Sequence, residues 1–458
     1  MERVDVAVVG GGPGGARAGA AAARHGADVV VLERGVPRAD RAEPGPDSTD
    51  AAGFLDYWVD LFGIPFEEIP DEIVLRELDG AAFFGPTTEA TIRTTGIEAS
   101  YDRFGFTFDR AAMDDWLRQR AVAAGASYRI GNRVVDVESE LGNGHRHRLS
   151  LADGSTIEAE FLICADGPQR TVTMQVLDQF LPENRSAGDV IGPRVANHIA
   201  YQEHRRMPPE LFEEDLLKFW WGYIPGETAY PWIFPNDETI ARIGLTMPMA
   251  LDIADVPDVE SYVLIEPDDE QIPPGKELLR RLLEHEYGDR YDLEEDFPLV
   301  PDRGKQHGIE SYAISSTRPI DSPTAAGVAV VGGAMGTTSA FHEGGYHLAG
   351  RTGAIAGELA ASDRLSRYNH AWREALETEI LRNVSFAELV QEYGPADWDR
   401  AFTLAGRMIG DSTGDRLIAR RLSAGPGAVK LLAAYKRTKF RLRDGRYVQL
   451  PESDYVFD

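Results

Sequence analysis

The chain has 458 residues, of which 43% are hydrophobic and 27% charged, so two or three domains around a large buried core are expected. Asp and Glu number 75 against 47 Lys and Arg, a net charge of −28, which disfavours nucleic acid as a partner because a polyanion repels its phosphates. Cys164 is the only cysteine, which excludes an intramolecular disulfide, a redox CxxC pair and a cysteine-rich metal site, and no metal site is predicted.

The sequence shows neither a recognisable signal peptide nor a membrane-spanning stretch, so a cytoplasmic protein is expected. Residues 1–9 enter an apolar run without the basic region or cleavage site of a signal peptide. No stretch of about 20 apolar residues follows that could span a bilayer. The basic residues are 41 arginines and 6 lysines, a composition typical of a salt-adapted cytoplasm or of a GC-rich genome.

The N-terminal segment, up to Glu33, has the pattern of a βαβ unit that binds a dinucleotide. An apolar, β-branched run over 4–9 predicts a buried strand, an Ala-rich helix follows over 16–25, and 28–32 predicts a second strand. Between the first strand and the helix, Gly10, Gly12 and Gly15 occupy the GxGxxG positions. These positions provide a tight turn, close approach to a pyrophosphate and packing of the helix on the strand.

Glu33 stands at the end of the second predicted strand. An acidic residue there accepts hydrogen bonds from the ribose hydroxyls of an adenosine and repels a 2′-phosphate, so NADP is disfavoured at this site. No second GxGxxG lies in another strand–helix–strand unit, so separate FAD and NAD domains are not expected. FAD is therefore favoured over NAD.

Two later segments are buried strands that end in turns. Phe161–Cys164 runs into Ala165-Asp166-Gly167, and Gly327–Val331 runs into a glycine-rich stretch at 332–336. A helix is then predicted from Tyr346 to Ala361, and it contains three glycines, each costing about 1 kcal/mol relative to alanine. Such a cost predicts close approach of this helix to a sheet or a ligand at Gly350, Gly353 and Gly357.

Together these residues resemble the FAD-dependent group that includes aromatic hydroxylases such as para-hydroxybenzoate hydroxylase, flavin halogenases and geranylgeranyl reductases. The resemblance covers most of residues 1–360 and rests on VVGGGPGGARA at the start, FDRAAMDDWL at 108–117, ADG at 165–167 and VVGGAMGTTSAFHEGGY at 330–346. The stretch YPWIFP at 230–235 is similar to the YxWxFP signature of geranylgeranyl reductases, and Arg318-Pro319 matches that subgroup's RP element. Halogenases carry an essential lysine early in the chain. This chain has no lysine before Lys218, so halogenation is disfavoured.

The resemblance implies an α/β fold with three parts. A Rossmann-like FAD-binding domain is expected from residues 1–75, 100–185 and 310–362, and a second, antiparallel-sheet substrate domain from 76–99 and 186–309. A C-terminal helical region is expected over 363–458, where periodicity predicts helices over Tyr368–Tyr393 and Trp398–Ile409.

The resemblance also implies which residues contact FAD. Arg110 is expected to bind the pyrophosphate, because a guanidinium forms charge-assisted hydrogen bonds with phosphate oxygens. The alternative is that Arg110 pairs with Asp114 on the helix surface. The full expected set is Gly10, Gly12, Gly14, Gly15, Ala16, Glu33, Arg110, Val134, Asp166, Gly333, Gly345 and Tyr346.

Two positions depart from the family pattern. Where the family has Gly-Asp, with the carboxylate on the ribityl hydroxyls, this chain has Gly332-Gly333, so that contact is missing or supplied elsewhere. Archaeal geranylgeranyl reductases carry a cysteine in the loop that corresponds to residues 43–50, and none is present here. A mechanism that relies on that cysteine cannot be transferred to this chain.

Reduction of an isolated isoprenoid double bond requires a hydride from reduced flavin, a proton, and a dry channel for an apolar chain. His342, Glu343, Tyr346 and His347 cluster near the expected flavin, and among them His342 and Tyr346 are the candidate proton donors. Aromatic side chains are the candidate walls of the channel, unless they only form the core of a sheet: Trp221, Tyr223, Tyr230, Trp232 and Phe234.

The sequence thus predicts an FAD-dependent reductase of geranylgeranyl chains, in membrane lipids or a prenylquinone, with ferredoxin or NAD(P)H as electron donor. The alternatives are an FAD-dependent monooxygenase of the aromatic hydroxylase type and a flavin-binding protein without catalysis. Residues 430–446 carry seven basic side chains against one acid, Asp444. This segment predicts peripheral contact with anionic lipids or docking of an acidic ferredoxin, unless it is a solvated face that pairs with nearby acids.

Overall fold

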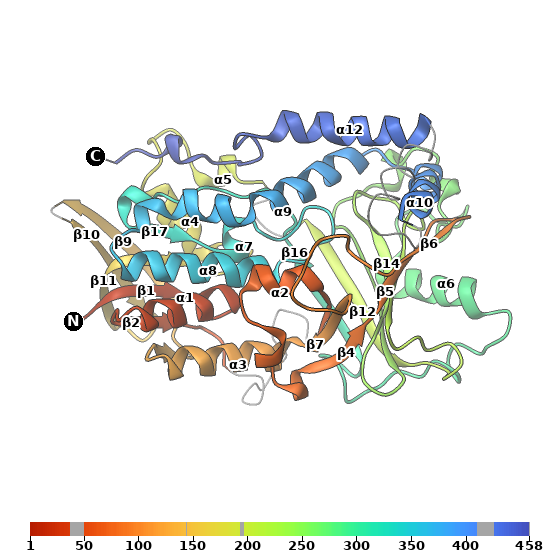
Figure 1. The fold of residues 1–458 in the computed structure, drawn as a ribbon, viewed down its shortest axis with the longest axis horizontal. Coiled ribbons are helices and arrows are strands. Elements are labelled where there is room, and N and C mark those ends of the chain that lie inside the picture. The colour runs from red at the N-terminus through yellow and green to blue at the C-terminus, as the bar shows by residue number, and fades with distance from the viewer. Residues whose placement is uncertain (37–49, 143, 193–196, 410–425, 458) are drawn as a thin grey trace.

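The computed structural model describes residues 1–36, 50–142, 144–192, 197–409 and 426–457. Two sheet-based lobes lie side by side, with the helices of the C-terminal region above them (Figure 1). Both chain ends lie at the same end of the first lobe. The mixed α/β fold expected from the sequence is confirmed.

The first lobe is built on a seven-stranded sheet with β8-β2-β1-β11-β10-β9 as its order and β17 beside β11. β8, β2, β1, β11 and β17 pair in parallel, whereas β9 and β10 form an antiparallel hairpin on β11. The strands are β1 (Glu2–Val9), β2 (Val29–Leu32), β8 (Ser127–Arg129), β9 (Val134–Gly142), β10 (Gly144–Leu151), β11 (Thr156–Cys164) and β17 (Val328–Val330). The parallel strands β2 and β17 are apolar and buried throughout, as strands covered on both faces require.

Helices α1 and α8 pack closely on each other against this sheet (Figure 1). A Cβ added at Gly353 would lie 1.9 Å from the carbonyl oxygen of Gly14, and one at Gly357 would lie 2.1 Å from that of Ala18. These glycines of α8 therefore allow close approach to a neighbouring helix, not to a sheet or ligand. The helices of this lobe are α1 (Pro13–Arg24), α3 (Arg110–Ala123), α4 (Thr171–Asp178), α5 (Ala187–Val190), α7 (Gly332–Met335) and α8 (Tyr346–Ala361).

A small aromatic layer joins the two lobes. It comprises helix α2 (Asp56–Phe62) and a three-stranded antiparallel sheet in which β7 (Gly105–Asp109) lies between β3 (Asp50–Leu55) and β4 (Val74–Leu78). Phe54 and Phe106 stack with ring centroids 5.2 Å apart in its core. This layer carries the start of α3 and therefore positions Arg110.

The second lobe is a seven-stranded sheet in the order β16-β12-β15-β14-β13-β5-β6. All its pairs are antiparallel except β13 with β5, which are parallel. Helix α6 (Gly275–Tyr287) packs on one face through leucines such as Leu278 and Leu282. The strands are β5 (Gly80–Phe84), β6 (Glu89–Ile92), β12 (His198–Arg206), β13 (Leu216–Trp220), β14 (Tyr230–Pro235), β15 (Ile240–Pro248) and β16 (Ile309–Ile314).

The C-terminal region contains α9 (Tyr368–Val390), α10 (Pro395–Ile409) and α12 (Pro426–Leu442). The first two correspond to the two helices that periodicity predicts. Tyr368, Trp372 and Leu376 of α9 lie in the core of the first lobe. Helix α9 is therefore packed onto the FAD-binding domain, whereas α10 packs on β5 and β6 of the second sheet through Trp398 and Phe402.

Three predicted domain boundaries require correction. The boundary at 75/76 falls within β4, which pairs with β7, and the boundary at 309/310 falls within β16, which pairs with β12 of the second sheet. Ala187 and Ile191, beyond the boundary at 185, are buried in the first core. In each case the assignment is decided by pairing or packing with residues distant in the sequence.

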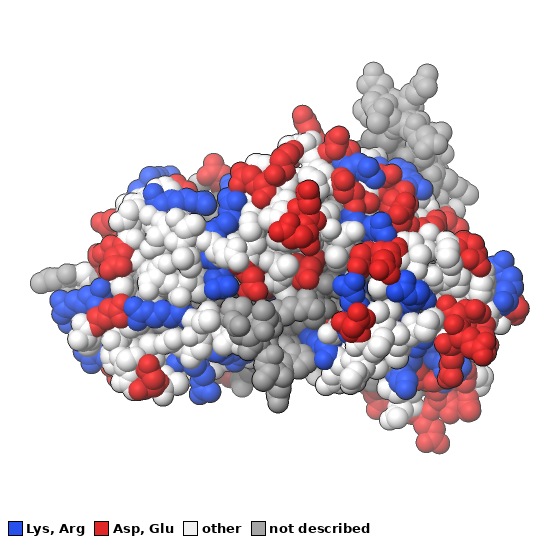
Figure 2. All heavy atoms as spheres, turned by 90° about the horizontal axis from the view of Figure 1, so that it is seen from below, with Lys and Arg blue, Asp and Glu red and all other residues white. Residues whose placement is uncertain are grey.

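Charged side chains cover much of the surface. On the face shown in Figure 2, acidic and basic residues are interspersed over both lobes, and acidic residues gather towards the end of the second lobe. This face offers no continuous basic surface of the kind that binds nucleic acid. Among the described residues no helix is long and apolar enough to cross a membrane.

Candidate active site

A cavity of about 1330 Å³ lies between the lobes and is lined by residues of both sheets, the aromatic layer and α9. Sites for single small ligands usually measure about 300–1,000 Å³. The cavity therefore has room for a cofactor together with a substrate. It extends from the glycine-rich turn after β1 to the aromatic face of the second sheet.

The three fingerprint glycines shape the turn between β1 and α1. Gly10 has φ +101°, and a Cβ there would lie 2.2 Å from the Ala165 carbonyl oxygen. A Cβ at Gly15 would lie 1.8 Å from the Gly10 carbonyl oxygen, whereas one at Gly12 would have no neighbour within 4 Å. Gly12 thus opens onto the cavity at the N-terminus of α1, where no side chain caps the free N–H groups.

Glu33 faces this turn from the end of β2. Its carboxylate accepts hydrogen bonds from the backbone N–H of Gly11 and of Gly35, each at 2.6 Å. Tyr128, which no sequence motif indicates, donates its hydroxyl to the Gly11 carbonyl at 2.5 Å. The two side chains fix the turn, and both line the cavity.

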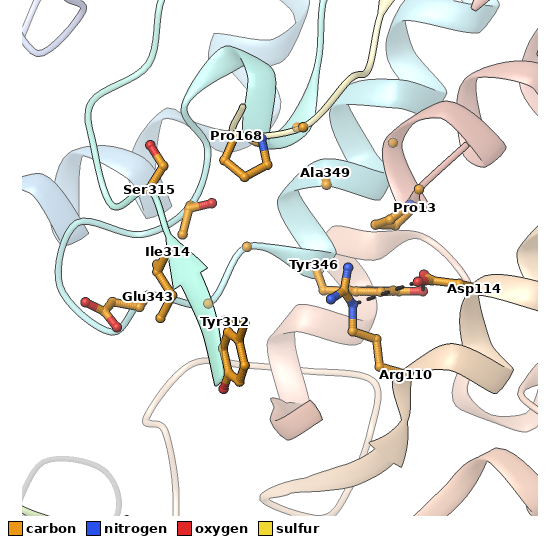
Figure 3. A pocket seen from close by; sticks show the side chains of 18 of the residues that line it. Pro13, Arg110, Asp114, Pro168, Tyr312, Ile314, Ser315, Glu343, Tyr346 and Ala349 are labelled. Atoms are coloured by element: carbon orange, nitrogen blue, oxygen red, sulfur yellow. Dashed lines mark hydrogen bonds and ion pairs between the residues drawn. The ribbon is translucent and has the colours of Figure 1, made fainter. Parts of the chain in front are cut away.

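Arg110 and Tyr346 converge on Asp114 on one side of the cavity, with Glu343 on the other (Figure 3). The Tyr346 hydroxyl donates to an Asp114 carboxylate oxygen at 2.7 Å, and Arg110 Nε lies 3.9 Å from the other oxygen. The pairing of Arg110 with Asp114 is thus present, yet both side chains face the cavity. Burial, and then the Asp114 charge, raise the pKa of Tyr346. The phenol therefore keeps its proton, which it donates in the hydrogen bond to Asp114.

Asp166 and Gly333 lie where the turns after β11 and β17 meet. The Asp166 carboxylate accepts from the backbone N–H of Val172 at 2.6 Å and of Thr173 at 3.1 Å, so it binds the first turn of α4. A Cβ at Gly333 would lie 3.0 Å from Cδ of Pro168. A side chain there would displace Pro168 by a few tenths of an ångström, and the residue provides no carboxylate for a ribityl contact.

The structure brings most of the predicted cofactor residues to one surface. Gly15 and Ala16 do not line the cavity, because Gly15 packs against Gly10 and Ala16 lies in the aromatic core around Phe54. The others line it: Gly10, Gly12, Gly14, Glu33, Arg110, Val134, Asp166, Gly333, Gly345 and Tyr346.

Four of the five predicted aromatic residues form the opposite wall. Trp221 stacks on Tyr230 with centroids 4.4 Å apart, and Trp232 stacks on Phe234 at 5.4 Å. These four side chains are at once part of the core of the second sheet and part of the lining of the cavity. Tyr223 is placed elsewhere, because it packs in the core under α6 with its hydroxyl 3.5 Å from Glu286.

Comparison with known proteins agrees with this geometry. An FAD-binding domain model matches residues 5–45, and a tryptophan halogenase model matches residues 84–186. Digeranylgeranylglycerophospholipid reductase of Methanocaldococcus jannaschii is 23% identical over 93% of this chain and 96% of its own. The second such reductase of Methanopyrus kandleri is 28% identical over 81% of this chain and 82% of its own.

Over most of its length the chain is similar in sequence to geranylgeranyl reductases, and its N-terminus matches an FAD-binding domain.

Solved structures share the fold of this chain. A geranylgeranyl bacteriochlorophyll reductase-like protein of Thermoplasma acidophilum has a TM-score of 0.67 at 20% identity, covering 95% of this chain and 100% of its own. A flavin-dependent brominase has a TM-score of 0.59 at 15% identity, covering 96% and 100%. The sequence relatives favour a reductase over the aromatic monooxygenase alternative.

FAD is the cofactor that the domain match supports, and the residues present fit it. Gly12 leaves open space at a helix N-terminus that suits a pyrophosphate, and Glu33 has carboxylate oxygens at the position expected for ribose hydroxyls. Arg110 provides a cation on the same wall. The Gly-rich turn, Glu33, Arg110 and Gly345 would hold the group, which supplies hydride chemistry when bound.

Several residues that line the cavity are not indicated by any sequence motif. Tyr57 of α2 donates to the buried Glu379 of α9 at 3.2 Å, and Asn383 donates to the same carboxylate at 3.1 Å. Arg382 pairs with Glu379 and lies beside Tyr57. No spacing in the chain could indicate this cluster, because α2 and α9 lie far apart in the sequence.

His342 is held neutral at the cavity wall. Its Nδ1 accepts from the Gly344 N–H at 3.2 Å, and its ring lies 5.1 Å from that of Trp58. Burial, and then the charge of Arg382, lower the pKa of His342 to about 3. A neutral imidazole is a weak acid near pH 7, so these contacts favour a structural role over proton donation.

Acid should destabilise the protein partly through His342. An unfolded histidine takes up a proton below pH ~6.5, while the folded one stays neutral down to about pH 3, so stability falls as pH falls through this window. We expect wild type to lose about 2 kcal/mol more than His342→Asn between pH 6 and pH 4. Urea unfolding of both proteins across this range measures the difference, and parallel curves would contradict it.

Proposed function

We propose that this flavoprotein reduces isolated carbon–carbon double bonds of geranylgeranyl chains in membrane lipids or a prenylquinone. The observation that carries the proposal is the continuity of the dinucleotide turn with an aromatic-walled cavity large enough for a second, apolar molecule. The names of the sequence relatives, digeranylgeranylglycerophospholipid reductases, support a substrate of this class.

The residues of the second sheet have a direct part in such a reaction. Trp221, Trp232 and Phe234 are each at most 5% exposed, and they exclude water from the face on which an isoprenoid would lie. Aromatic faces bind alkenes by dispersion and stabilise a developing positive charge. Bound FAD would supply the hydride, and the chain must hold the substrate and supply a proton.

The first experiment is anaerobic reduction of candidate substrates. The protein is incubated with FAD and dithionite, together with geranylgeranylated lipids or prenylquinones, and the products are weighed by mass spectrometry. We expect a gain of ~2 mass units per reduced bond; free FAD and dithionite without protein serve as the control. Unchanged masses with FAD still bound would overturn the proposal, and oxygen uptake with aromatic substrates would then be assayed.

We propose a reduced ferredoxin or NAD(P)H as the electron donor. The chain shows no second dinucleotide motif, so either donor would have to act at the cavity that holds the flavin. Bleaching of the flavin absorbance under anaerobic conditions, measured with each donor in turn, separates the two.

We also propose that the protein is cytoplasmic and docks on anionic membrane lipids through α12. The helix exposes apolar side chains, with Val429 55% and Phe440 58% exposed. Arg441 pairs with Glu388 and Arg443 lies 3.3 Å from Asp444. Within the described part of the chain the other basic side chains have no ion pair: Lys430, Lys436, Arg437, Lys439 and Arg446.

This arrangement suits a lipid surface, because apolar and basic side chains share one exposed helix on an otherwise acidic protein. Each basic residue near an anionic membrane contributes about 1 kcal/mol. The double variant Lys436→Glu/Arg437→Glu should therefore bind vesicles containing phosphatidylserine at least about 30-fold more weakly at low salt.

The matched control for vesicle binding is Lys276→Glu/Arg290→Glu, which reverses two exposed charges on and just after α6. It should bind vesicles as wild type does. Equal binding by both double variants would contradict the lipid surface. Loss of ferredoxin-driven flavin reduction without any change in vesicle binding would instead assign α12 to a ferredoxin.

A further inference from the structure

Glu343 and His198 form a buried pair at the wall of the cavity. Glu343 lies in the loop between α7 and α8 and lines the cavity (Figure 3), and His198 is the first residue of β12. The His198 Nδ1 atom lies 3.6 Å from the Glu343 Oε1 atom, and the two side chains are only 7% and 4% exposed. Neither atom has a hydrogen-bond partner within the described residues, so each faces the other across this contact.

The hydrogen bonds around His198 determine where its proton lies. Its Nε2 is 3.0 Å from the carbonyl oxygen of Glu227. Because a carbonyl can only accept, Nε2 carries a hydrogen and Nδ1 of the neutral ring is a bare lone pair. A bare nitrogen facing a bare carboxylate would be repulsive, so we infer that the pair holds one proton, which the Glu343 carboxyl can carry towards the cavity.

The backbone holds Glu343 in a costly conformation to present this carboxyl. Its φ is +59°, in the left-handed region that non-glycine residues avoid. Two hydrogen bonds fix the loop. The Glu343 N–H donates to the Ser339 carbonyl at 3.1 Å, and the Tyr230 hydroxyl donates to the His342 carbonyl at 3.1 Å. Residues in strained conformations occur preferentially at functional sites.

Three other titratable groups of the cavity are poorer proton donors. The Tyr346 hydroxyl donates its hydrogen bond to Asp114, and the Tyr230 hydroxyl donates to a backbone carbonyl, so neither hydrogen points to a substrate. His342 is neutral. Burial raises the pKa of Glu343, which keeps its carboxyl protonated above the range of an exposed glutamate.

We propose that Glu343 is the acid that protonates the substrate carbon, and that His198 is a positioning residue that holds the transferable proton. This rests on the proposed function. Hydride from the reduced flavin forms one C–H bond of the former double bond. At the other carbon a second C–H bond forms as the Glu343 O–H bond breaks, which leaves a carboxylate beside His198. A proton from water restores the pair.

The test is Glu343→Gln, which keeps size and polarity but holds no acidic proton. In a single turnover of the reduced, FAD-loaded enzyme, product formation should slow at least about 100-fold, the range for loss of a general acid. FAD retention and flavin reduction by dithionite should be unchanged. The matched control is Glu286→Gln, which alters a half-buried glutamate that also has a raised pKa, behind the second sheet, and should react at the wild-type rate.

A second measurement needs no catalysis. The ¹⁵N resonances of His198 in the apoprotein, identified by their absence in His198→Asn, should shift in Glu343→Gln and stay in place in Glu286→Gln. His198→Asn should also slow the single turnover, and the double variant should be no slower than Glu343→Gln alone, because the two residues act as one unit.

Each outcome bears on the proposal. An active wild type with Glu343→Gln within 3-fold of its rate, or unshifted His198 resonances, would overturn the proton-donor role alone. A wild type that reduces no isoprenoid would overturn the proposed function and the donor role together. Slow turnover in Glu343→Gln with normal FAD binding supports both.

Discussion

Replacing Gly12 by Asp is expected to weaken FAD binding by about three orders of magnitude while the chain still folds. Gly12 has φ −68°, which any residue adopts, and an added Cβ meets nothing within 4 Å. The new carboxylate would stand in the open space at the N-terminus of α1. Two unit charges about 4 Å apart repel by about 4 kcal/mol at an effective dielectric constant of 20, which corresponds to about 1,000-fold in affinity.

Titration of FAD into the apoprotein, followed by flavin fluorescence, measures this change. The matched control is Gly142→Asp at the end of β9, where an added Cβ also meets nothing within 4 Å. It makes the same substitution far from the turn, so its FAD affinity should equal that of wild type. An affinity of Gly12→Asp within 10-fold of wild type would show that this turn does not hold the phosphates.

The sequence predicts those parts of the site whose signals are local. The glycine turn is one, because Gly10, Gly12 and Gly15 each have a steric task set by residues within one βαβ unit or its neighbouring strand. Helix α8 is another: its predicted ends, Tyr346 and Ala361, are the observed ends. Its glycines indicate close packing, but only the structure shows that α1 is the partner.

The remaining parts depend on contacts between distant segments. β16 belongs to the second sheet because it pairs with β12, which lies much earlier in the chain. Tyr223 faces α6 although Trp221, just before it in the sequence, faces the cavity. The Glu343 and His198 pair likewise joins two segments that are far apart in the sequence. Neither periodicity nor motif spacing contains such information, since tertiary pairing decides it.

Replacing Gly353 by Ala is expected to destabilise the protein by about 2 kcal/mol and to weaken FAD binding as well. The new Cβ would lie 1.9 Å from the Gly14 carbonyl oxygen, so α1 and α8 would have to separate by about 1 Å. Such overpacking costs about 1–3 kcal/mol, occasionally more, and exceeds the gain of about 1 kcal/mol in helix propensity. Because Gly14 belongs to the dinucleotide turn, the shift would also displace the FAD site.

The matched control for this substitution is Gly427→Ala in α12, where the new Cβ would make only an ordinary contact with Leu404 at 3.7 Å. At Gly427 no steric clash opposes the gain in helix propensity. The stability of the variant should therefore be unchanged or higher by up to about 1 kcal/mol. The urea midpoint and FAD affinity of both variants separate packing from propensity. Since both make the same chemical change in a helix, opposite signs can arise only from the contact between α8 and α1, whereas equal midpoints would show that these helices do not touch at Gly353.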